Sequence, residues 1–170
     1  MSLPILFEIP DGADSADRLE LFVAFSRFKL DVLGARSNWD ASSWDLSLYL
    51  PTNGAHRTKV LRWKLTKSKG GKEFSSEFSN FAKAYVCYVH SLNPKKSYDV
   101  ELAALRIIYL SLQEFCENSD ITRVSPDLLN HCVTLISQTY RTGAAYTTGR
   151  AAVRIPAFFH LLGRVPLRFP

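Results

Sequence analysis

Three side chains near the end of the sequence combine a spacing and a chemistry that suit contact with a polyanion. Thr147, Arg150 and Arg154 recur at helical intervals, so an α-helix would place them on one face. Two guanidinium groups and a hydroxyl are groups that contact phosphate oxygens. A solvated amphipathic helix shows the same kind of stripe, so the spacing alone leaves both interpretations open.

The helix that carries these residues closes a series of helical patterns in the second half of the chain. It should begin near Gly143 or Ala144 and run to about Leu162, and Pro156 should kink or interrupt it. Its packing side should consist of Val153, Ala157, Phe158, Leu161 and Leu162.

Charge is unevenly distributed along the chain of 170 residues, which has a formal net charge of +5. Acids outnumber bases in residues 1–49, whereas residues 56–72 and the tail from Arg141 carry bases and no acid. Two such basic blocks could form a binding surface for a polyanion, although solvated loops can show the same pattern.

Membrane and secretory classes are not indicated. No apolar run approaches the roughly 18 residues of a membrane span, and the N-terminus lacks the pattern of a secretory signal.

The three cysteines are odd in number and lie in helical patterns, which favours reduced, buried thiols in a cytosolic protein. Because the sequence stops directly after a helical pattern, we expect a fragment of a longer protein.

The residues that could support catalysis or metal binding do not form a recognisable set. A metal site would require Cys87 and His90 to meet His131 and Cys132, but the last two are adjacent and should point in different directions. The four histidines stand in unrelated contexts, and a Gly-rich phosphate loop is missing. We therefore expect no metal, no cofactor and no catalysis by this chain alone.

The N-terminal half predicts an extension, residues 1–70, in front of a helical domain, residues 71–170. After a loose lead-in, a helix over about 14–34 should be capped by Ser15 and stopped by Gly34. Residues 44–66 contain two alternating apolar runs around an Asn-Gly turn, which predicts a β-hairpin with one apolar face. The Lys/Gly-rich residues 66–71 should form the linker between the two parts.

The C-terminal half predicts four helices. The first, about 73–92, carries an aromatic seam that we assign to core packing, and the second covers about 98–118. Ser125 followed by a proline predicts the start of the third helix, which should end near Tyr140. The members of the seam are Phe74, Phe78, Phe81, Tyr85, Tyr88 and Leu92.

Residues 73–163 resemble the N-terminal core-binding domain of tyrosine recombinases of the phage-integrase type. The resemblance lies in the order and length of the helices and in three segments. These are Phe78–Tyr85, Glu101–Leu112, and the series Thr147, Arg150, Arg154, Phe158, Phe159 and Leu162. The resemblance implies a mainly α fold, a four-helix SAM-like orthogonal bundle over about 73–163. Pro156 and the hairpin-like region depart from the family pattern.

The resemblance also implies a function, the binding of duplex DNA by a fragment of a site-specific recombinase. The family's catalytic domain would be absent from this chain, since His160 is not followed by the arginine of a His-x-x-Arg motif. Double-stranded DNA and self-association through the full-length recombinase are the expected partners, with no membrane and no small-molecule substrate. The expected location is the cytoplasm, with the nucleoid, in a prokaryote or phage-derived element. The expected DNA-binding residues are Arg150, Arg154, Thr147, Arg106, Lys95, Lys96, Arg141 and Thr142.

Two other functions remain open at this point. A helical protein–protein interaction module could use partly exposed aromatic seams to bind a partner helix. A helix-turn-helix repressor would need a short turn between two helices, and the connection over residues 118–125 is longer than that.

Overall fold

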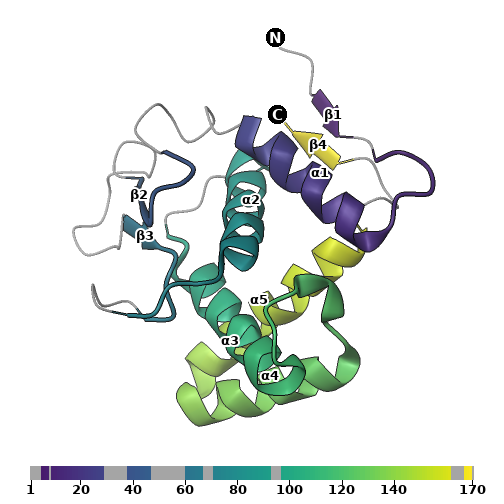
Figure 1. The fold of residues 1–170 in the computed structure, drawn as a ribbon. Helices are drawn as coiled ribbons and strands as arrows, with labels where there is room; N and C mark the ends of the chain where they lie inside the picture. Colours follow the sequence, from purple (N-terminus) through teal and green to yellow (C-terminus); the bar gives the residue numbers. More distant parts are fainter. Residues whose placement is uncertain are drawn as a thin grey trace.

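Helices dominate the structure, and two short two-stranded antiparallel sheets accompany them (Figure 1). A computed structural model describes residues 5–7, 9–28, 38–46, 60–66, 71–92, 97–161 and 167–169. The elements are β1 (Ile5–Phe7), α1 (Ser15–Phe28), β2 (Ser43–Asp45), β3 (Val60–Arg62), α2 (Ser76–Leu92), α3 (Asp99–Cys116), the 3₁₀-helix η2 (Ile121–Arg123), α4 (Pro126–Thr139), α5 (Thr142–Leu161) and β4 (Leu167–Phe169). Within the described residues, no helix is both long and apolar enough to cross a bilayer.

Helix α3 is the centre of the helical part. Every residue from Glu101 to Tyr109 is buried, and the helix packs against α2, α4 and α5. A helix that is apolar over most of its circumference must be covered on most sides, which explains why three other helices surround it. The predicted apolar side, which includes Leu102, Leu105 and Leu112, is confirmed.

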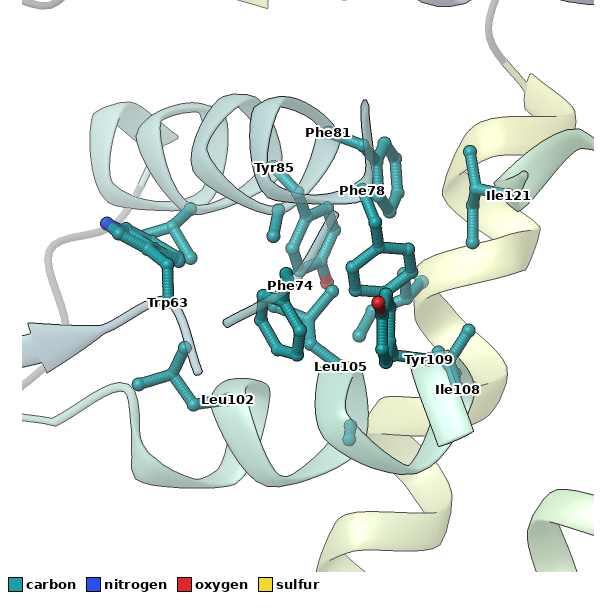
Figure 2. Packing of buried hydrophobic residues seen from close by; sticks show 14 of the residues in the cluster. Trp63, Phe74, Phe78, Phe81, Tyr85, Leu102, Leu105, Ile108, Tyr109 and Ile121 are labelled. Carbon is teal, nitrogen blue, oxygen red and sulfur yellow. The ribbon is translucent and has the colours of Figure 1, made fainter. Parts of the chain in front are cut away.

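The predicted aromatic seam, which begins at Phe74 just before α2 and continues along that helix, lies in the core except at its end (Figure 2). The ring centroids of Phe74 and Phe78 both lie 5.0 Å from that of Tyr109 of α3. Such tilted and edge-on pairs add to the free energy gained by burying apolar area. The prediction for Leu92 is wrong, because its side chain is 53% exposed at the last residue of the helix.

Helix α1 packs against α2 and buries Phe22 completely. The Phe22 ring lies 6.2 Å from the ring of Tyr88 and 5.3 Å from that of Phe158. The predicted cap at Ser15 is wrong. Asp14 Oδ1 accepts hydrogen bonds from the backbone N–H groups of Ala16 at 2.8 Å and Asp17 at 2.9 Å. The predicted end at Gly34 lies outside the described residues.

The predicted hairpin is present as the antiparallel pair β2–β3, with Trp44 opposite Leu61. Trp44, Leu46, Leu61 and Trp63 are all buried, so the prediction of one apolar face is confirmed. The strands are shorter than the predicted runs, and the Asn-Gly turn lies outside the described residues.

The chain on both sides of the predicted linker is paired rather than loose. The Leu65 N–H donates to the Lys72 carbonyl at 2.9 Å, and the Phe74 N–H donates to the Trp63 carbonyl at 3.1 Å. One hydrophobic core cluster includes residues from before and after residue 70. The division into an extension and a helical domain stays a prediction.

The ends of the described chain meet in a sheet that the sequence pattern did not predict. Strand β1 pairs antiparallel with β4, with Ile5 opposite Phe169. The lead-in that we expected to be loose is therefore held at residues 5–7 by backbone hydrogen bonds of the β ladder. The pairing brings segments from opposite ends of the sequence side by side (Figure 1).

The helix starts provide the first test. We predict that Asp14→Ala lowers the free energy of unfolding by about 1 kcal/mol, because two backbone donors lose their acceptor. Ser15→Ala should change it by less than about 0.5 kcal/mol. Urea denaturation followed by circular dichroism measures both, and a larger loss for Ser15→Ala would contradict the cap seen here.

A buried histidine provides the second test. His90 Nδ1 lies 2.6 Å from the Tyr98 hydroxyl oxygen, and burial lowers the pKa of His90. Since the unfolded chain then binds the proton more tightly, stability should be lost as the pH falls below the unfolded value of about 6.5. We predict that His90→Gln reduces the loss of unfolding free energy between about pH 7.5 and about pH 5.5.

The matched control for this test is His131→Gln, which replaces a histidine that is only half-buried and bonds to Glu114 at 2.9 Å. If the His90→Gln protein lost as much stability with acid as the unsubstituted protein, the buried neutral state of His90 would be refuted.

Candidate nucleic-acid interface

Helix α5 packs on α3 and α4 through a narrow set of mostly small side chains. Thr148, Ala151, Ala152 and Ile155 are all buried, with Thr148 only 3% exposed. Because α5 is a regular helix, burying these residues turns the side chains between them toward solvent. Helix α5 continues through Pro156 without interruption, so the predicted break is not found.

The predicted packing side of α5 is wrong in two positions and right in one. Val153 is 52% exposed and Ala157 is also exposed, because the buried stripe runs through Ala152 and Ile155 instead. Phe158 does pack inward, with its ring 4.8 Å from the ring of Tyr88. The side chain of Leu161 and the whole of Leu162 lie outside the described residues.

The exposed side of α5, which we call the Arg150 face, collects the predicted phosphate-binding groups. It consists of Tyr146, Thr147, Arg150, Val153 and Arg154, all of which are exposed. Neither arginine forms an ion pair with any residue that the structure describes. The guanidinium groups are therefore free to bind an external anion.

Contacts along the helix restrict two side chains of the Arg150 face. The Arg150 guanidinium carbon lies 5.7 Å from the ring centroid of Tyr146, a cation–π arrangement that limits its motion. Thr147 Oγ1 donates to a backbone carbonyl one turn earlier, at 3.1 Å from Ala144 O. Its lone pairs remain able to accept a hydrogen bond, but its proton is already used.

A shallow groove lies beside the Arg150 face, between α4 and α5. Its volume is about 490 Å³, and Val133 of α4 forms part of its wall with an exposed fraction of 57%. The remaining lining residues are Ala145, Tyr146, Gly149, Arg150, Val153 and Arg154. The groove is thus lined mostly by apolar side chains and by the two arginines.

Two of the other predicted residues lie at the start of α5. Arg141 and Thr142 are both exposed, and the Arg141 carbonyl accepts the first helical hydrogen bond, from Ala145 N at 2.8 Å. They lie at the N-terminal end of α5, where backbone N–H groups also favour an anion.

Arg106 is placed differently from the other predicted residues. It is only 8% exposed, and its Nε donates to the Lys64 carbonyl at 2.7 Å. Its Nη2 lies 3.4 Å from the Arg62 carbonyl, so the guanidinium fixes the hairpin to α3. We therefore leave Arg106 out of the candidate interface. Lys95 and Lys96 lie outside the described residues.

Tyr146 is a member of the face that sequence reasoning missed. It is 66% exposed, and its spacing of four residues from Arg150 is a signal in the sequence that points to it.

Farther along the helix, the charge of Arg154 acts on Tyr85 of α2. Burial, followed by the charge of Glu101, raises the pKa of Tyr85 to about 12, and Arg154 opposes that change.

The cysteines and histidines do not converge. The described residues contain no group of three or more potential metal-ligating side chains. Cys132 Sγ donates to Ser111 Oγ at 3.1 Å, and burial raises the pKa of the Cys87 thiol. A thiol held in its neutral form is a poor nucleophile and a poor metal ligand.

Comparison of the chain with known protein families, curated proteins and solved structures found no match.

The contrast between Arg106 and Arg150 is testable. We predict that Arg106→Met lowers the free energy of unfolding by about 2 kcal/mol, since two backbone carbonyls, those of Arg62 and Lys64, lose a charged donor. Arg150→Met should change it by less than about 0.5 kcal/mol, because the side chain is exposed. Urea denaturation compares the two, and equal effects would contradict the positions assigned to these arginines.

Proposed function

We propose that this chain binds double-stranded DNA through the Arg150 face, as the core-binding part of a site-specific tyrosine recombinase. The observation that carries the proposal is the pair Arg150 and Arg154, exposed one turn apart without an ion pair among the described residues. Free guanidinium groups in this arrangement suit the phosphates of a duplex backbone.

Charge around the face supports the same proposal. From residue 128 to the end of the chain there is no acid, so no carboxylate of α5 competes with phosphate for the arginines. Arg141 adds a third exposed cation at the start of α5. A surface with cations and no acids attracts a polyanion over distances comparable with the Debye length.

The sequence resemblance supports the recombinase assignment. Helices α2, α3, α4 and α5 follow one another along the chain, as the four helices of the proposed SAM-like bundle would. In that family a separate domain cleaves the strand, so this chain would bind DNA and leave cleavage to that domain. Self-association would then take place through the full-length recombinase.

A second function is favoured by the apolar character of the groove. Val133, Tyr146 and Val153 are each more than half exposed, and such a row can receive the apolar side of a partner helix. In that case the arginines would contact acids at the rim of the partner helix.

Salt dependence separates the two functions. We predict that Arg150→Ala combined with Arg154→Ala weakens duplex binding and reduces the slope of log affinity against log salt by about 2. Fluorescence anisotropy of a labelled duplex at several salt concentrations measures this, and circular dichroism checks that helical content is retained.

The matched control replaces two exposed cations away from α5, Arg123→Ala with Lys72→Ala. It removes the same charge but should leave most of the affinity intact. Unchanged affinity in the α5 double variant, or an equal loss in the control, would refute the Arg150 face as the DNA site.

A further inference from the structure

A second groove lies between α1, the first turn of α2 and η2. Its volume is about 430 Å³, which falls within the range of about 300–1,000 Å³ typical of pockets that hold a small organic group. Phe78 of α2 and Ile121 of η2 line it and are almost fully buried, and Leu19 and Val23 of α1 are half-buried beside them. The groove therefore gives access to apolar side chains at the edge of the core.

Carboxylates belong to the lining of this groove, which we call the acidic groove. Glu20 of α1 and Glu77 of α2 are both exposed, and neither forms an ion pair with any residue that the structure describes. Asp120, the third acid of the lining, already lies 3.7 Å from Arg123 Nε and accepts a hydrogen bond from the Thr122 hydroxyl. Two carboxylates are thus free to meet an external cation.

The surface around α1 is acidic over a wider area than the groove. Residues 11–24 contain four acids and one base. Asp11 and Asp17 are exposed and line a neighbouring groove that shares Glu20 with the acidic groove. The base, Arg18, is half-buried and donates through its Nε to a backbone carbonyl at 2.9 Å. This part of the surface should therefore attract a cationic partner.

The Arg150 face has the opposite chemistry. Tyr146 is 66% exposed, and the exposed Arg150 lies over its ring without an ion pair among the described residues. Val133 and Val153 add exposed apolar surface beside them. Tyrosine and arginine are the residue types that most often dominate binding at protein interfaces. The face thus offers an apolar ring that a pocket can enclose, next to a cation that a carboxylate can meet.

The two surfaces do not meet within one chain. Helix α1 lies in the upper part of Figure 1, whereas the light-green start of α5 lies at the bottom. The two grooves share no lining residue. Each surface therefore keeps unpaired charges of one sign beside apolar side chains, and a second copy of the chain carries the complement. Complementary charges of this kind steer two molecules together and fix their register.

We propose that the chain self-associates head to tail, with Tyr146 of one copy seated in the acidic groove of the next. Arg150 of the first copy would then meet Glu20 and Glu77 of the second. Because the contact joins two different surfaces, each dimer leaves one acidic groove and one Arg150 face unoccupied, so further copies can add or close a ring.

A copy docked in this way covers the residues that we assign to DNA, so a duplex and a second copy would compete for the Arg150 face. Only this competition rests on the proposed function, because the contact itself requires no DNA. A chain that binds the duplex but never self-associates would refute the contact alone. A chain that self-associates as described but does not bind the duplex would refute the proposed function alone.

Two complementary variants test the contact. Tyr146→Ala with Arg150→Ala disables the Arg150 face and keeps the acidic groove, whereas Glu20→Lys with Glu77→Lys disables the groove and keeps the face. All four side chains are exposed, so both variants should fold. In sedimentation velocity at about 100 µM and low salt, each variant should be monomeric alone, and their mixture should form a one-to-one complex and nothing larger.

The control reverses two exposed acids that line neither groove, Glu117→Lys with Asp127→Lys. It makes the same change of charge as the groove variant and should retain self-association. An unsubstituted chain that stays monomeric, a mixture of the two variants without a complex, or an equal loss in the control would each overturn the proposal.

A single substitution tests the residue that carries the contact. Tyr146→Ala alone should weaken self-association of the chain about tenfold or more, because it removes the ring that fills the groove. Circular dichroism checks that helical content is retained. An unchanged dissociation constant would contradict the position assigned to Tyr146.

Discussion

The close packing of α5 on the central helix α3 is the constraint on which the candidate interface depends. Ala151 and Ala152 of α5 and Ala104 of α3 are all essentially fully buried. Small side chains allow two helices to approach closely, and that approach fixes the rotation of α5 about its own axis. Once Thr148 and Ile155 face inward, the Arg150 face has to meet solvent, and the two arginines cannot be withdrawn without breaking this packing.

The packing of each helix also determines what its basic side chains contact. Arg106 lies on α3, which is buried over nearly its whole length, so its guanidinium satisfies backbone carbonyls of the hairpin. Lys83 lies on the buried side of α2 and is enclosed by tryptophans. Arg150 and Arg154 lie on the one side of α5 that no other described element covers. The position of each cation follows from the packing of its helix rather than from its local sequence.

Sequence patterns predicted the features that arise from local periodicity. The four C-terminal helices and the Ser125 cap, which accepts from Leu128 N at 3.2 Å, are confirmed. The paired strands with one apolar face are confirmed as well. These features depend on residues within a few positions of each other, which is where propensity and spacing carry information.

Features that depend on distant partners were missed or misassigned. The β1–β4 pairing joins opposite ends of the sequence, and no local pattern specifies such a partner. Val153 was expected to be buried because it is apolar, but packing on α3 selected the smaller Ala151 and Ala152 instead. The burial of Arg106 required knowledge of where the hairpin carbonyls lie. Tyr146 was overlooked because aromatic residues are normally assigned to the core.

The most direct measurement of the central claim is a residue-resolved titration of the ¹⁵N-labelled chain with a short DNA duplex. The account predicts that the largest changes in backbone and arginine side-chain signals fall on the Arg150 face, with Arg141 nearby. Signals of the buried α3 residues should change little. Changes that centre on another surface, or a spectrum unaffected by the duplex at low salt, would contradict it.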